Sequence, residues 1–149
     1  MSKCFVVEHS LDLVLPFGTF ERNMKDFALK HECEDQMPYA VSTDGKFRME
    51  LKEAAEVENH LVRITGWRDE RALHLRKLYV AEPLVLDGVV TDFLDLLEVW
   101  AKEHKGCFYF KYVDVDEQFV DEYRIVRGLE KYVSYTEHEV LELLEQWSD

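Results

Sequence analysis

Apolar residues recur with two periods along the chain, and the period predicts the type of each element. Leu11, Leu13 and Leu15 occupy every second position, which predicts a short strand that ends at Pro16. A helix is expected next, behind a candidate N-cap at Thr19. Its apolar face recurs every three to four residues and consists of Phe20, Met24, Phe27, Ala28 and His31.

Two hairpins are expected after this helix. The dipeptide Asp44-Gly45 favours a tight turn with positive φ at both central residues, and it lies between β-rich runs at residues 39–43 and 46–51. A second hairpin is predicted by two runs rich in Leu, Val, Ile, Tyr and Trp, at residues 60–67 and 72–80. The two hairpins together indicate an antiparallel meander.

The second half of the chain contains the most regular helical pattern. We expect a helix from a candidate N-cap at Thr91 to His104, ended by Gly106. Its apolar face consists of Phe93, Leu94, Leu97, Trp100, Ala101 and His104. Two strands joined by an acidic turn follow, at residues 107–115 and 119–126. A capping-box pattern at Thr136 and Glu139 then predicts a third helix.

These elements predict an α+β fold in which three helices pack with an antiparallel sheet of about six or seven strands. The 149 residues contain no repeat, low-complexity tract or Pro/Gly/Ser-rich linker, so we expect a single domain spanning residues 1–149. Hydrophobic residues make up 47% of the chain and supply the material for one core.

The chain is strongly acidic, with a formal net charge of −13, and the charge is unevenly distributed. Residues 1–81 contain 14 acidic and 12 basic side chains, whereas residues 82–149 contain 17 and 6. Such a field repels phosphates and anionic membranes and attracts basic proteins. We therefore expect neither nucleic acid nor membrane as a partner, while solubility alone is the alternative explanation.

The charge asymmetry favours a non-enzymatic protein-binding module whose acidic surface recognises a basic partner, as an inhibitor, immunity protein, antagonist or dedicated chaperone does. The expected binding residues are Asp114, Asp116, Glu117, Asp121, Glu122, Glu139, Glu142 and Glu145. The order of elements, the size and the acidity are similar to those of class I secretion chaperones and some bacterial toxin-immunity proteins.

A small hydrolase or metal-dependent enzyme that uses His and Cys, or carboxylates, is the first alternative. His31 with Cys33, and His104 with Cys107, each pair an imidazole with a thiol at short spacing, and two such pairs suit tetrahedral zinc. Helix ends and core positions explain the same residues, since His favours the C-terminal pole of a helix and buried Cys is common. The chain lacks a glycine-rich phosphate loop, a Gly-x-Ser-x-Gly turn and an EF-hand pattern, so we assign no cofactor or metal.

Two further segments have more than one interpretation. Residues 105–112 partly resemble the RNA-recognition-motif signature, but they belong to the acidic half, which favours a core strand. A basic cluster lies in or beside the second hairpin: Arg63, Arg68, Arg71, Arg76 and Lys77. It suits an anion or nucleic acid, or it pairs with the acidic half of the same molecule or of a second copy. The last possibility makes a structural, self-associating subunit the second alternative.

The remaining features indicate a cytoplasmic protein. The first ten residues lack the long apolar run of a secretory signal, and charged residues interrupt every apolar stretch before it reaches membrane-spanning length. Three cysteines at wide, irregular spacing fit reduced thiols better than a disulfide framework.

Overall fold

The computed structural model describes residues 2–54, 56, 58–114 and 119–126, and it has the expected α+β architecture with one antiparallel sheet. The described residues form two α-helices and eight strands, not six or seven. The strands are β1 Ser2–Leu15, β2 Tyr39–Val41, β3 Lys46–Lys52, β4 His60–Arg68, β5 Leu73–Val80, β6 Leu84–Leu86, β7 Cys107–Asp114 and β8 Phe119–Val126. The helices are α1 Phe17–His31, the short 3-10 helix η1 Glu34–Gln36 and α2 Gly88–Glu103. The third helix expected after Thr136 lies outside the described residues.

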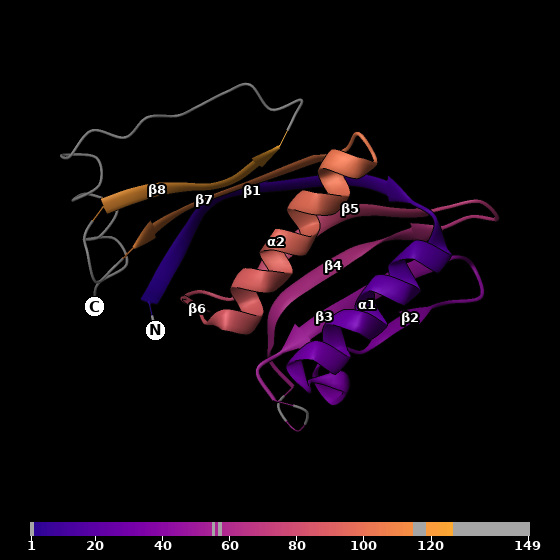
Figure 1. Ribbon diagram of the computed structural model, residues 1–149, viewed down its shortest axis with the longest axis horizontal. Coiled ribbons are helices and arrows are strands. Elements are labelled where there is room, and N and C mark those ends of the chain that lie inside the picture. Colours follow the sequence, from indigo (N-terminus) through magenta and orange to yellow (C-terminus); the bar gives the residue numbers. More distant parts are fainter. Residues whose placement is uncertain (1, 55, 57, 115–118, 127–149) are drawn as a thin grey trace.

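The strands follow the order β2-β3-β4-β5-β1-β7-β8, and β6 pairs with the N-terminal part of β1 (Figure 1). Both expected hairpins are present as β2–β3 and β4–β5, and the pairing of β3 with β4 completes the predicted meander. Gly45 adopts a φ of 85° in the first turn, a conformation that favours glycine. The first strand of the chain therefore joins the meander to the β7–β8 hairpin.

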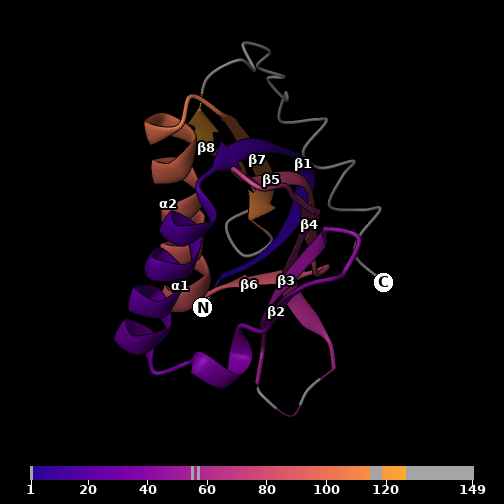
Figure 2. The ribbon, with the colours of Figure 1, turned by 90° about the vertical axis from the view of Figure 1, so that its right-hand side faces the viewer.

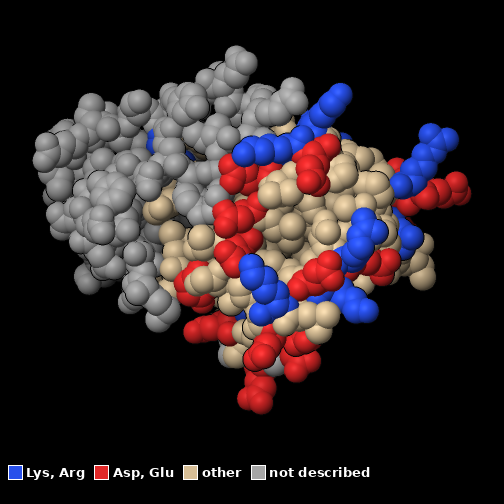
Figure 3. All heavy atoms as spheres, viewed as in Figure 1, with Lys and Arg blue, Asp and Glu red and all other residues tan. Residues whose placement is uncertain are grey.

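Both helices lie side by side on one face of the sheet (Figures 1 and 2). Phe20 of α1 contacts Phe47 of β3 and Trp100 of α2, with ring centroids 5.2 and 6.0 Å apart. These three aromatic side chains are fully or almost fully buried and join the helices to the sheet. Acidic and basic side chains are interspersed on the helix side (Figure 3). We call the sheet face turned away from the helices the outer face.

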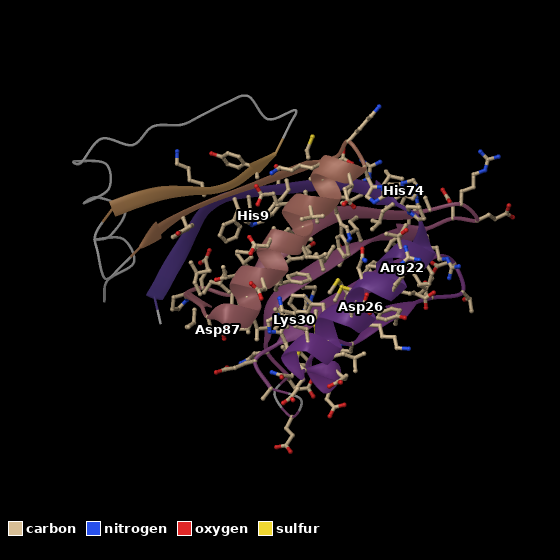
Figure 4. All side chains as sticks on the ribbon, viewed as in Figure 1. His9, Arg22, Asp26, Lys30, His74 and Asp87 are labelled. Atoms are coloured by element: carbon tan, nitrogen blue, oxygen red, sulfur yellow. The ribbon has the colours of Figure 1, made fainter. Side chains whose placement is uncertain are left out.

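Both helices begin earlier than predicted. The N-cap of α2 is Asp87 and not Thr91, because the Asp87 carboxylate accepts a hydrogen bond from the backbone N–H of Val90 at 2.9 Å (Figure 4). Helix α1 starts directly after Pro16, whose carbonyl accepts the N–H of Thr19, so Thr19 lies inside the first turn. Helix α2 is thus capped by a different side chain from the one predicted, whereas α1 begins after Pro16 without a side-chain cap hydrogen bond.

Strand β1 is longer than predicted, and strand β7 decides between two interpretations of its sequence. Strand β1 begins at Ser2 instead of Leu11, because its N-terminal part is paired on both sides, with β6 and with β7. Strand β7 carries the segment that resembles the RNA-recognition motif. Its Phe108, Phe110 and Tyr112 are buried in the core, so they present no stacking surface and the core-strand interpretation is confirmed.

Candidate functional site

Cationic and aromatic side chains gather on the outer face of β3, β4 and β5. Cross-strand partners project from the same side of a sheet, so the pairing assigns three rows of residues to this face. Read from β3 to β5, the rows are Lys46–Trp67–His74, Arg48–Thr65–Lys77 and Glu50–Arg63–Tyr79. The alternate residues Phe47, Met49 and Ile64 are buried on the helix side.

Thr65 has the smallest side chain in these rows, and larger neighbours surround it. They border an open cavity of about 620 Å³ on the outer face, which we call the Thr65 cavity. It is lined by Ala40, Val41, Ser42, Lys46, Phe47, Arg48, Thr65, Gly66, Trp67, Arg76, Lys77 and Tyr79. Four of these described residues are cationic and none is acidic, although the whole chain has a formal net charge of −13.

A β-bulge places two of these cations side by side. The register of β4 and β5 shifts between Thr65 and Gly66, so β5 contributes an extra residue, and Arg76 and Lys77 are both exposed although they are consecutive in a strand. The backbones approach closely here: a Cβ on Gly66 would lie 1.7 Å from the carbonyl oxygen of His74. Glycine at this position therefore allows the bulge.

Trp67 forms one wall of the Thr65 cavity. Its indole stacks on the imidazole of His74, with centroids 4.6 Å apart and planes inclined by 12°. The guanidinium carbon of Arg76 lies 4.9 Å from the indole centroid. Trp67 remains 42% exposed, and Tyr79, in the row beyond Thr65, is 41% exposed. Aromatic surface is thus available to a ligand at both ends of the cavity.

Two carboxylates outside the cavity hold the groups around Trp67. Asp69 Oδ2 lies 2.8 Å from Nε2 of His74, and its other oxygen accepts the backbone N–H groups of residues 71–72. These hydrogen bonds, with that of His74 the largest cause, lower the pKa of Asp69 to about 2. On the neighbouring strand, Asp12 accepts a hydrogen bond of 2.9 Å from Arg76.

Positive charge on this face exceeds the negative charge that pairs with it. Glu50 accepts hydrogen bonds from Arg48 and, at 3.1 Å, from Arg63, so two guanidinium groups share one carboxylate. The bond from Arg48 is the main cause of the lowered pKa of Glu50. Among the described residues, no carboxylate lies within ion-pair distance of Lys77.

The chemistry of the Thr65 cavity suits binding more than bond cleavage. Its described lining contains no carboxylate, imidazole or thiol to serve as a base or nucleophile. The Ser42 hydroxyl is held in the β2–β3 turn by Asp44 and by the backbone N–H of Lys46. Arginine and lysine beside aromatic rings instead suit an anionic group attached to an apolar or planar body.

The structure places three of the eight acidic residues predicted to bind a partner. Asp114 is the last residue of β7, and Asp121 and Glu122 are neighbours on β8. In the register, Glu122 pairs with Lys111 and Asp121 with Tyr112. The other five, Asp116, Glu117, Glu139, Glu142 and Glu145, lie outside the described residues.

The structure does not bring the two His–Cys pairs together. His31 Nε2 lies 3.0 Å from Asp92 near the start of α2, whereas His104 follows the last residue of that helix. Residues 92 and 104 are separated by about 18 Å along a helix axis. A zinc site built from both pairs is therefore wrong, and the described ranges contain no other group of three or more potential metal ligands.

Three residues of the predicted basic cluster lie on the outer face: Arg63, Arg76 and Lys77. Arg68 instead stacks its guanidinium 3.7 Å from the centroid of Phe17, and Arg71 belongs to the β4–β5 turn. Sequence reasoning missed Lys46 and Arg48, which come from the other hairpin. Their spacing on alternate positions of one strand was the available signal, since such residues share a face.

Neither described α-helix is long and apolar enough to cross a membrane. The chain has no significant match among protein-family models, curated proteins or solved structures. The evidence for a function therefore comes from the geometry of the outer face.

Proposed function

We propose that this chain is a non-enzymatic binding protein that recognises an anionic group in the Thr65 cavity. The observation that carries this proposal is the lining itself, which contains four cations and no carboxylate. A volume of about 620 Å³ lies within the roughly 300–1,000 Å³ typical of ligand sites.

The surrounding charges support recognition at short range. The excess acidity of the chain repels a distant anion, so the attraction must come from groups that touch the ligand. Arg48 and Lys77 flank Thr65 from the two neighbouring strands and are the cations nearest to the centre of the rows. Charge-assisted hydrogen bonds from such groups are about twice as strong as neutral ones.

A second candidate function rests on the charge asymmetry. Residues 82–149 carry 17 acidic and 6 basic side chains, and an acidic surface in this half is a candidate for a basic protein partner. This recognition uses different residues from the Thr65 cavity, so both modes can exist in one binding protein.

The test of the main proposal uses inorganic pyrophosphate as the probe. Titration into isotopically labelled protein is expected to shift the backbone amide signals of residues 46–48, 65–67 and 76–79 in NMR spectra. The double variant Arg48→Gln/Lys77→Gln should weaken this binding at least tenfold. The matched control is Arg22→Gln/Lys25→Gln, which removes two exposed cations from α1 on the other side of the sheet. Pyrophosphate binding that is absent, or equally affected by both pairs, would contradict the proposal.

A further inference from the structure

We infer that the ligand of the Thr65 cavity is a small aromatic phosphate, whose planar ring lies on Trp67 and whose phosphate lies between Arg48 and Lys77. This inference rests on the proposed function and specifies the class of ligand. It follows from the shape of the cavity, the open surface of one ring and the placement of the cations.

The shape of the cavity selects a compact ligand. Along β4 the outer-face residues are Trp67, Thr65 and Arg63, which alternate large, small and large. Across the strands, Thr65 lies between the long side chains of Arg48 and Lys77. Larger side chains therefore surround Thr65 on four sides. The hollow of about 620 Å³ is open to solvent and has a size suited to a single ring with one substituent.

Trp67 offers a fixed surface for a planar ring. The His74 stack and the contact with Arg76 hold the indole, and Asp69 in turn holds His74. Because the ring is already positioned but remains 42% exposed, a ligand ring can stack without ordering a mobile side chain. Stacking on aromatic side chains tolerates any flat ring, so it does not by itself choose between bases and simpler aryl groups.

The cations lie at the distance that an aryl phosphate requires. Thr65 and Trp67 are two residues apart on one strand, or about 7 Å. Arg48 and Lys77 lie beside Thr65 on the adjacent strands, each about 5 Å away in the backbone. A ring on Trp67 therefore places a substituent between a guanidinium and an ammonium. Lys77, which has no described ion-pair partner, suits a dianionic phosphate, and Arg48, whose Nε and one terminal nitrogen already donate to Glu50, adds its remaining N–H groups.

Calorimetric titration with four probes tests this inference: phenyl phosphate, adenosine monophosphate, glycerol 3-phosphate and inorganic phosphate. The two aromatic probes should bind at least tenfold more tightly than the two non-aromatic ones. A preference between phenyl phosphate and adenosine monophosphate identifies the source of the ring. The variant Trp67→Leu should abolish the aromatic preference and leave inorganic phosphate binding within about twofold, whereas Trp67→Phe should retain the preference. Lys77→Gln should weaken the binding of all four probes. Melting curves check that each variant is folded.

The outcomes separate this inference from the proposed function. If all four probes bind equally and Lys77→Gln weakens them, the cavity binds anions but the aromatic ligand is wrong. If Trp67→Leu and Trp67→Phe lose the preference alike in folded proteins, the ring does not lie on Trp67. If a phosphotyrosine peptide binds while phenyl phosphate and adenosine monophosphate do not, the ligand is a protein segment and the small-ligand inference is overturned. Failure of every anion, pyrophosphate included, overturns both proposals.

Discussion

The indole nitrogen of Trp100 donates a hydrogen bond to the side-chain oxygen of Asn23, 2.8 Å away, and so links α2 to α1. Trp100 is 0% exposed and also contacts Phe20. One side chain thus supplies both apolar packing and the polar contact between the two helices. A buried tryptophan N–H requires such a partner, because an unpaired buried donor is costly.

Replacing Trp100 should therefore reveal two separate contributions to stability. Trp100→Ala is expected to lower the free energy of unfolding by about 3–5 kcal/mol, as large aromatic deletions in cores do. Asn23→Ala keeps the ring but removes its acceptor, and should cost about 1–3 kcal/mol. Urea denaturation of both variants measures these values. An unchanged midpoint for Trp100→Ala would show that the helices do not depend on this contact.

The close approach at Gly66 yields a second prediction about stability. A Cβ at this position would overlap the His74 carbonyl, so Gly66→Ala should destabilise the protein and displace β4 from β5. Gly18 is the matched control, because it lies in the first turn of α1 with no atom within 4 Å of an added Cβ. Gly18→Ala should stabilise the protein by about 0.4–1 kcal/mol. Thermal melting checks the prediction: the melting temperature should fall for Gly66→Ala and rise for Gly18→Ala.

The alternation of apolar residues predicted most of this fold, because burial on one side of a strand or helix leaves a direct trace in the sequence. Leu11, Leu13 and Leu15 are all buried as expected, and the predicted apolar face of α2 is correct except for His104, which follows the helix. The N-terminal part of β1 was not predicted, because the apolar alternation that we used begins at Leu11, whereas the strand begins at Ser2 and pairs with β6 and β7. The start of α2 was misplaced because Asp87 and Thr91 are both good cap residues, and Asp87 is the one that accepts the capping hydrogen bond.

The candidate site depends on strand register and could not be read from the sequence. Arg48 and Lys77 lie 29 positions apart in the chain and become neighbours only through Thr65. The bulge at Gly66 turns Arg76 and Lys77 to the same side, whereas strict alternation would have placed them on opposite faces.

The Asp69–His74 contact predicts how the protein responds to acid. The folded-state pKa of Asp69 is about 2, below its ordinary value of 3.8, so the contact stabilises the folded form above about pH 4. That stabilisation is lost as the pH falls from about 4 through 2, when the carboxylate is protonated in the folded state. His74→Ala should raise the Asp69 pKa towards its ordinary value, since the His74 hydrogen bond is the largest cause of the shift.

Carbon-detected NMR titration of the Asp69 carboxyl measures this pKa directly. Tyr79→Phe is the control, because it changes another outer-face residue without touching Asp69 or His74. A midpoint near 3.8 in the wild-type protein would contradict the hydrogen bond, and with it the support that we assign to the wall formed by Trp67.

The acidic half of the chain provides the last prediction, which tests the second candidate function. A basic protein partner would first be captured from the native host. If the acidic residues form its recognition surface, neutralising five of them should slow association much more than it speeds dissociation, since peripheral charges act mainly through steering. The five are Asp114, Asp116, Glu117, Asp121 and Glu122, replaced by Asn or Gln. Added salt should imitate the substitutions, because the Debye length is only about 8 Å at ~0.15 M.

Stopped-flow association at several salt concentrations separates recognition from solubility. The control neutralises five exposed carboxylates of the first half, namely Asp26, Glu32, Glu34, Asp35 and Glu53, and so changes the net charge equally. If charge acts only through the net field, both sets should slow association alike. If a surface of the acidic half is recognised, the first set should act more strongly. An association rate that changes neither with salt nor with either set of substitutions would refute recognition through the acidic half.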